Sequence, residues 1–205
     1  MMNLPPDLKI ERETSANKTR YLRVADEARA KAAMLDWPAK GLRVGLVWSG
    51  NPKSAREHFR SVRPDELGPL LGVQGVHFFS LQTGTAREQL KELKVNGSVA
   101  RVKDLTPRIR VIADTAAVME QLDLMITVDT AMAHLAGALN RPVWVMIPAV
   151  PDWRWMIRRT DAPCYRTMRL YRQEKLGAWA AVVEQMRRSL QASAQRAEKL
   201  PGATR

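Results

Sequence analysis

The sequence has a single cysteine and no long apolar stretch. Cys164 is the only cysteine among the 205 residues, so no disulfide bond can form within the chain. No apolar run approaches the roughly 20 residues that a membrane-spanning helix requires. Residues 1–15, MMNLPPDLKIERETS, contain no apolar signal core. From these absences we expect a cytoplasmic protein without a membrane span.

Motifs of several enzyme classes are also missing. A Walker phosphate loop is excluded at residues 45–53, because Pro52 removes a backbone N–H that the phosphate needs and no Gly-Lys-Ser/Thr follows. No Gly-x-Gly-x-x-Gly follows the first predicted strand, which disfavours a dinucleotide oxidoreductase. The histidines lack metal-ligand spacing. Because Asp-x-Asp is absent, a metal-dependent sugar transferase is disfavoured, and we predict neither a metal nor a cofactor.

Acidic residues are outnumbered by basic ones. The chain has 33 Lys and Arg against 21 Asp and Glu, a formal net charge of +12. Such an excess favours polyanionic partners. The basic residues are scattered, however, with no aromatic residues interleaved among them and no zinc-finger spacing. A basic surface that favours anionic small molecules explains the charge equally well, so nucleic acid is not the partner we expect.

Short apolar runs alternate with helical patterns along most of the chain. The predicted strands are 42–48, 76–81, 99–102, 124–128, 143–147 and, more weakly, 165–171. The predicted helices are 21–35, 65–71, 85–93, 114–122 (capped by Asp114-Thr115), 131–139 and 177–190. This alternation predicts an α/β fold with a mostly parallel, doubly wound sheet. We expect a helical arm at 1–40, a single Rossmann-like three-layer domain at 41–190 and a basic flexible tail at 191–205.

The most informative stretch is 122–148, LDLMITVDTAMAHLAGALNRPVWVMIP. It predicts a strand, a helix and a second strand, with polar residues where the first strand ends. Ligands of open α/β sheets bind outside the carboxyl ends of the strands. Asp129, Thr130 and His134 are therefore the first candidates for a site.

A helix N-terminus could balance the charge of a diphosphate without a metal. Its free N–H groups and partial positive charge are worth about 0.3–1 kcal/mol per anion when exposed, and up to ~2 kcal/mol when partly buried. Thr130 adds a hydroxyl, and His134 lies one turn further on the same face, where we expect it as a cation. Asp129 would cap the helix or face a sugar hydroxyl. The alternatives are plain N-capping for Asp129-Thr130 and a core position for His134.

Five further residues complete the candidate site. Gly50 and Asn51 follow the first strand, and Gln82 follows the second, so all three are expected at the same crevice. Arg60, after a polar loop, could contact phosphate, and Trp153 could form a wall for a nucleotide or sugar. Ordinary turns, a solvated arginine and an aromatic cover for the sheet edge are the alternatives.

Seven segments in this order carry a family resemblance: VGLVWSGNPK, RSV at 60–62, FFSLQTG, ADTAAVMEQLDLMITVDTAMAHLAGAL, RPVWVMIP, PDWRW and YRTMRLYRQ. Over about 21–190 they resemble the C-terminal domain of bacterial glycosyltransferases of family 9 type. The likeness is greatest to the branch often fused to tetratricopeptide repeats, and heptosyltransferases are more distantly similar. The resemblance implies one half of a GT-B architecture, in which two Rossmann-like domains face a cleft. The C-terminal half holds a nucleotide-sugar donor without an essential metal.

By the same resemblance, Asp129, Thr130 and His134 bind the diphosphate and sugar of the donor. His134 and the helix start would stabilise the departing diphosphate, so we assign His134 a catalytic role. The resemblance also implies which residues line the cleft, namely Gly50, Asn51 and Arg60.

The chain departs from the family pattern at several places. Ala131 stands where heptosyltransferases usually have glycine, which narrows the space at the diphosphate. The loop between Pro52 and Arg60 has KSAREHF in place of the usual His and Asn-Asp. Cys164 and Arg166 replace the usual tryptophan and proline.

The largest departure is the lack of room for an acceptor domain before residue 42. That domain generally supplies the base of inverting GT-B enzymes, which is worth about 10²–10⁴-fold in rate. We therefore interpret the chain as the donor-binding half of a glycosyltransferase that needs an acceptor domain or partner protein. The alternatives are a non-catalytic nucleotide or nucleotide-sugar binding module, and a basic nucleic-acid-associated protein with a Rossmann-like core.

Overall fold

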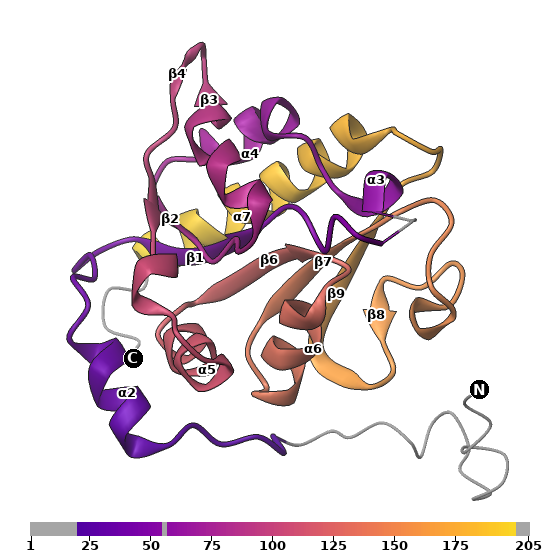
Figure 1. The fold of residues 1–205 in the computed structure, drawn as a ribbon. Coiled ribbons are helices and arrows are strands. Elements are labelled where there is room, and N and C mark those ends of the chain that lie inside the picture. The colour runs from indigo at the N-terminus through magenta and orange to yellow at the C-terminus, as the bar shows by residue number, and fades with distance from the viewer. Residues whose placement is uncertain (1–19, 55–56, 200–205) are drawn as a thin grey trace, which may run out of the picture.

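A computed structural model describes residues 20–54 and 57–199. Its main strands are β1 (Leu42–Val47), β2 (Val76–Ser80), β5 (Val102–Asp104), β6 (Leu124–Val128), β7 (Val143–Ile147), β8 (Asp161–Ala162) and β9 (Tyr165–Arg172). They form one sheet in the order β5-β2-β1-β6-β7-β9-β8 (Figure 1). Neighbouring strands are parallel except for β8 and β9, which are antiparallel. The predicted α/β fold with a mostly parallel sheet is confirmed.

Helices cover both faces of this sheet (Figure 1). On one face lie α2 (Asp26–Ala33), α5 (Ile112–Glu120) and α6 (Ala131–Ala138). On the other lie α4 (Gly68–Leu71) and α7 (Trp179–Lys199). The β6 side chains alternate between the two hydrophobic clusters, with Met125 in the first and Ile126 in the second. Alternation along a strand buried on both sides is what produces the three layers.

Shorter elements connect the layers. They are α3 (Glu57–Arg60), the 3-10 helices η1 (Pro64–Leu67), η2 (Thr85–Glu92), η3 (Thr106–Arg108) and η4 (Trp153–Trp155), and the hairpin of β3 (Lys94–Val95) and β4 (Ser98–Val99). None of the helices in the described part of the chain is long and apolar enough to cross a membrane.

The strand order reverses between β1 and β6. From β1 the chain moves outward through β2 to β5, and then returns to β6 on the other side of β1. Val47 of β1 pairs with Thr127 of β6, so Gly50 and Thr130 each lie three residues beyond a paired position. Ligands of such sheets bind at the carboxyl ends of the strands at the reversal point. The fold therefore brings the residues predicted after β1 and those predicted after β6 to the carboxyl ends of two neighbouring strands.

The third predicted strand, 99–102, is two separate elements. Val99 belongs to the β3–β4 hairpin, and the sheet strand begins only at Val102. Asn96 and Gly97 turn the hairpin with φ angles of 50° and 81°. An Asn-Gly pair with both φ angles positive is the preferred two-residue hairpin turn, and it is a signal that the sequence analysis missed.

Helix boundaries also differ from the prediction. The helix expected at 114–122 begins at Ile112, so Asp114 lies within its first turn and not before it. There the Asp114 carboxylate accepts hydrogen bonds from the backbone N–H groups of Arg110 (2.9 Å) and Val111 (3.2 Å). The segment 85–93 is a 3-10 helix rather than a regular α-helix.

The closing helix is longer than predicted. α7 continues to Lys199, because the apolar stripe that ends in the prediction at Leu190 extends to the buried Ala194. Residues 191–199 of the expected flexible tail are thus helical, while 200–205 lie outside the described residues.

The N-terminal arm contributes a shorter helix than expected. α2 begins at Asp26 rather than at residue 21. The backbone N–H groups of Tyr21 and Leu22 instead donate to the carbonyl of Ala138, at the end of α6, over 3.2 and 3.3 Å. Residues 1–19 of the predicted arm lie outside the described residues.

Candidate functional site

The turn from β6 into α6 is closed by Thr130. The Thr130 hydroxyl accepts a hydrogen bond from the backbone N–H of Met132 (3.2 Å) and lies 3.1 Å from the hydroxyl of Thr127. Thr130 has extended backbone, as an N-cap requires. The first turn of α6 contains no acidic residue, so no side chain within that turn offsets its partial positive charge.

Asp129 is buried at the end of β6, with 7% of its surface exposed. Since Thr130 is the residue that caps α6, capping is not the role of Asp129. Of the two roles predicted for this carboxylate, contact with a sugar hydroxyl is the one that stays a prediction. Ala131, the first residue of α6, is exposed.

His134 is half-buried between two aromatic rings. Its imidazole stacks on Trp155, with centroids 5.2 Å apart and planes at 21°, and its Nδ1 lies 3.1 Å from the Tyr165 hydroxyl. Burial and the nearby Arg154 lower the pKa of His134, and they outweigh Asp129 and Asp152, which raise it. Without a bound anion the lowered pKa favours the neutral imidazole at pH 7, and the cationic form expected beside a diphosphate stays a prediction.

At the end of β1, a buried glutamate organises the polar groups. Glu57 is 8% exposed and accepts hydrogen bonds from the Gly50 backbone N–H, the Ser61 hydroxyl and the Arg60 guanidinium (2.8 Å). Burial by itself would raise the pKa of Glu57, but these hydrogen bonds outweigh it and hold the pKa below the usual value. A Cβ on Gly50 would lie 2.7 Å from the Glu57 carboxylate, so a larger residue there would displace this carboxylate.

Glu57 was not among the predicted residues. The sequence analysis regarded 53–59 as a polar loop that departs from the family pattern. The only signal was an acidic residue three positions before Arg60, which is the spacing of a helical ion pair.

Gln82 and Asn51 have structural roles. The Gln82 carbonyl accepts from the backbone N–H groups of Trp48 and Ser49, both at 3.0 Å, and its amide donates to the carbonyls of Ser49 and Thr83. These four hydrogen bonds use the full capacity of the side chain. Gln82 thus holds the loop after β1 in place. The Asn51 carbonyl accepts from the Lys53 N–H (3.0 Å), which closes a local turn.

Two neighbouring tryptophans differ in what they contact. Trp153, the predicted wall residue, is 66% exposed, and the Arg154 guanidinium lies 6.0 Å from its ring centroid. Trp155 is buried and is the ring that stacks on His134. Trp155 and Tyr165 are therefore the aromatic partners that the sequence analysis missed at this site.

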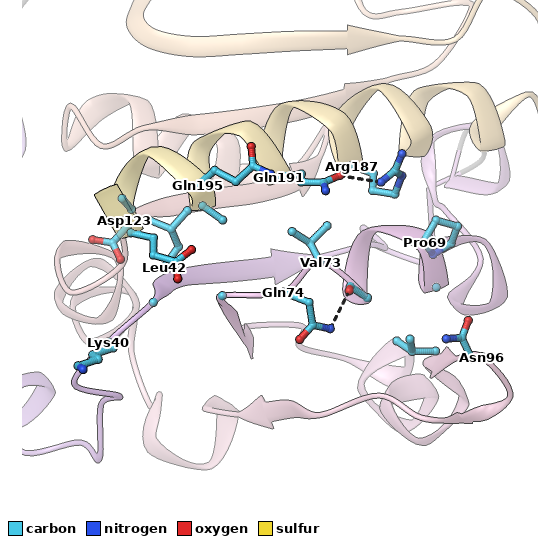
Figure 2. Close-up of a pocket in the computed structure, with 18 of the residues that line it drawn as sticks. Lys40, Leu42, Pro69, Val73, Gln74, Asn96, Asp123, Arg187, Gln191 and Gln195 are labelled. Carbon is cyan, nitrogen blue, oxygen red and sulfur yellow. Dashed lines mark hydrogen bonds between the residues drawn. The ribbon is translucent and has the colours of Figure 1, made fainter. Parts of the chain in front are cut away.

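A large hollow lies at the opposite edge of the sheet. It has a volume of about 1920 Å³ and is lined by the amino ends of strands, near Leu42 and Asp123, and by the last turns of α7, including Gln191 and Gln195 (Figure 2). Because Asp129 and His134 lie beyond the carboxyl ends of the strands, the hollow is not part of the predicted site. Within residues 20–54 and 57–199, no three His, Cys, Asp or Glu side chains are grouped as a metal site would need.

Fold and geometry define a Rossmann-like α/β domain with polar groups gathered where the strand order reverses. Within that class, residues 65–146 match the sequence model of Glycosyltransferase family 9 (heptosyltransferase). The match covers less than half of the chain. It includes Asp129, Thr130 and His134 but not the Gly50–Arg60 side of the site.

Known proteins are similar to this chain over most of its length. Protein FlbA of Caulobacter vibrioides is 29% identical over 181 residues, which is 85% of this chain and 29% of FlbA. The E. coli ADP-heptose LPS heptosyltransferase II has a TM-score of 0.59 at 16% identity, over 85% of this chain and 54% of that one. The family 9 glycosyl transferase of Veillonella parvula has a TM-score of 0.60 at 11% identity, over 96% of this chain and 57% of that one.

A further solved structure, E. coli heptosyltransferase WaaC with ADP, has a TM-score of 0.55 at 20% identity, over 80% of this chain and 48% of that one. At such identities these likenesses show the fold. The chain therefore has a fold like one half of a heptosyltransferase. It spans about half the length of these solved structures and 29% of FlbA.

Proposed function

We propose that this chain is the donor-binding half of a metal-independent glycosyltransferase, which moves a sugar from a nucleotide diphosphate sugar to an acceptor hydroxyl. The observation that carries the proposal is the turn from β6 into α6, within the segment that matches Glycosyltransferase family 9. There a capped helix N-terminus, a buried carboxylate and an imidazole lie together at the reversal of the strand order.

The chemistry follows from the charge that develops on the leaving group. When the bond from the sugar to the diphosphate breaks, negative charge accumulates on the diphosphate oxygens, and donors fixed beforehand stabilise it most. The N-terminus of α6 supplies the backbone N–H of Ala131 and a positive dipole end. His134 has an N–H to donate in both its neutral and its cationic form. Asp129 would accept a hydrogen bond from a sugar hydroxyl.

Arg60 and Gly50, which follow β1, would line the donor cleft opposite the residues that follow β6. Ala131 and the exposed Trp153 would border it. Gln82 would act indirectly, because its hydrogen bonds hold the loop that carries Gly50.

The acceptor side is part of the proposal. Because the chain spans about half of the solved relatives, we propose that a second domain or a separate protein supplies the acceptor site and the general base. We further propose that the chain corresponds to the C-terminal half of the branch fused to tetratricopeptide repeats. The cytoplasmic location stays a prediction.

Nucleotide binding is the first test. UDP, ADP or GDP, added without magnesium, should raise the melting temperature of the protein, because ligands that bind only the folded state stabilise it. His134→Ala should abolish that shift, whereas His77→Ala, an exposed histidine at the start of β2, should keep it. If none of the three nucleotides shifts a protein that unfolds cooperatively, the donor-site proposal is wrong.

A non-catalytic nucleotide-sugar binding module is the second candidate, and the half-length match to the solved structures favours it. A labelled nucleotide sugar separates the two. An enzyme half should transfer or hydrolyse the sugar, faster with an acceptor domain added, whereas a module should bind it unchanged. Salt-sensitive binding to duplex DNA without nucleotide binding would instead support the nucleic-acid alternative.

A further inference from the structure

Tyr165 lies against α6 at a position that only glycine permits. A Cβ on Gly137 would lie 2.4 Å from the Tyr165 ring, well inside van der Waals contact. The ring can therefore approach the helix backbone, and its hydroxyl reaches the imidazole of His134, one turn earlier on α6, at 3.1 Å. The packing of the Tyr165 ring against Gly137 therefore fixes the contact between Tyr165 and His134.

A second tyrosine continues the contact. The Tyr21 hydroxyl lies 3.5 Å from that of Tyr165, and the backbone N–H of Tyr21 is fixed to the Ala138 carbonyl at 3.2 Å. On the other side, Trp155 stacks on the imidazole and restrains the plane of the ring. Among the described residues, none hydrogen-bonds Nε2 of His134.

We propose that Tyr165 is a positioning residue for His134, oriented in turn by Tyr21, and that it makes the imidazole present Nε2–H to the diphosphate of the nucleotide sugar. The inference rests on the proposed function, because it assigns the second nitrogen of His134 to that ligand. Tyr165 acts through His134 and has no contact of its own with the reacting atoms.

The direction of the hydrogen bond decides which nitrogen carries the proton. Burial, and next the Tyr21 hydroxyl, raise the pKa of Tyr165, so its phenol keeps its proton at neutral pH. A neutral imidazole has one N–H and one acceptor nitrogen. When the phenol donates to Nδ1, the imidazole proton is on Nε2, which can then donate to a phosphate oxygen. The opposite tautomer would turn a lone pair toward the anion and repel it.

This arrangement would let His134 donate to an anion without becoming cationic. A cationic imidazole was expected because an anion would favour it, but burial lowers its pKa. With Tyr165 as donor, the neutral ring retains its useful N–H without a charge that the half-buried site would have to solvate.

Nitrogen NMR of the unliganded full chain tests the tautomer directly. In ¹⁵N-histidine-labelled protein at pH 7.5, His134 should show a protonated Nε2 and an unprotonated Nδ1. Tyr165→Phe should convert this to a mixture of tautomers, and Tyr21→Phe should do so more weakly. Tyr171→Phe is the matched control, because Tyr171 lies on the same strand but packs in the other hydrophobic cluster, and it should change nothing. A protonated Nδ1 in the wild type overturns the inference.

ADP and UDP titrations by calorimetry provide the second readout. Loss of one neutral hydrogen bond is worth about a fivefold change in affinity, so Tyr165→Phe should weaken the nucleotide that binds by up to about that factor. The variant should still unfold cooperatively, with a melting temperature lowered by a few degrees because the hydrogen bond is also absent from the unliganded protein. Equal affinity of Tyr165→Phe and wild type contradicts the inference. If neither nucleotide binds the wild type but Nε2 carries the proton, the proposed function fails and the positioning of His134 stands.

Discussion

The two strand ends at the reversal point hold their polar groups in different ways. At the end of β6, the Thr130 hydroxyl and carbonyl accept from the N–H groups of Met132 and Ala133, which leaves the Ala131 N–H at the start of α6 for a ligand. At the end of β1, the buried carboxylate of Glu57 gathers the Gly50 N–H and the Arg60 guanidinium. The first side uses backbone dipoles and the second a paired charge. The Arg60–Glu57 pair adds little net charge, so we infer that the N-terminus of α6 contributes more affinity for a diphosphate than Arg60 does, with the buried carboxylate of Asp129 turned to a sugar hydroxyl and not to the diphosphate.

Removal of Glu57 is the largest expected break on the β1 side. Glu57→Ala leaves Arg60 without its partner and two further donors unsatisfied, so it should lower the free energy of unfolding by about 3 kcal/mol. Urea denaturation measures the effect. Asp65→Ala, which removes an exposed partner of Arg63, is the control and should change stability little. If Glu57→Ala were as stable as wild type, the β1 side would not be organised by this carboxylate.

An extra methyl group at Gly137 should disturb the β6 side. Gly137→Ala places a Cβ against the Tyr165 ring, and overpacking of this kind costs about 1–3 kcal/mol. The double variant Gly137→Ala with Tyr165→Ala removes the obstacle, so the alanine should then cost nothing relative to Tyr165→Ala alone. Additive costs in this double-mutant cycle would mean that the ring and helix are not coupled.

Loss of the Thr130 cap should cost less stability than the two changes above, but it should also affect ligand binding. Thr130→Ala should lower the free energy of unfolding by about 1 kcal/mol, the usual value for an N-cap. It should also weaken nucleoside diphosphate binding, because the hydroxyl and the helix start act on the same anion. Thr130→Ser keeps the hydroxyl and should restore both properties. If Arg60→Ala weakened binding more than Thr130→Ala, the inferred ranking of the two sides would be reversed.

The same comparison shows what the sequence could reveal. The β6 side is local: strand, cap and imidazole lie within eleven residues, 124–134, so the alternation of apolar and polar residues predicted it. The parallel sheet, and the gathering of polar residues at the carboxyl ends of its strands, followed from the same alternation and from the rules for such sheets. The strand order and the pairing of β1 with β6 were not predicted.

The remaining parts of the site depend on contacts between distant segments. Tyr165 reaches His134 across 31 positions, and Gln82 reaches the loop after β1 across 33 and 34. No local pattern reports such contacts, so Trp153 was chosen where its neighbour Trp155 makes the contact. Glu57 was missed because its neighbours suggested a solvated loop, although the burial of its carboxylate required several donors.

A fall in pH should reduce the stability that Glu57 contributes on the β1 side and leave the contribution of Thr130 on the β6 side unchanged. Hydrogen bonds from Ser61, Arg60 and Gly50 hold the pKa of Glu57 in the folded protein below its usual value, so its contribution to stability is fully present above that usual value. As the pH falls through the folded pKa, the carboxylate becomes protonated and this contribution is lost. The difference in melting temperature between wild type and Glu57→Gln should therefore shrink as the pH falls below about 4.5, the usual pKa of a glutamate. The difference between wild type and Thr130→Ala should stay nearly constant there, because a threonine hydroxyl does not titrate. A constant Glu57→Gln difference would mean that Arg60 and Ser61 do not select the ionised form of Glu57, and the contrast between a charged and a dipolar side would not hold.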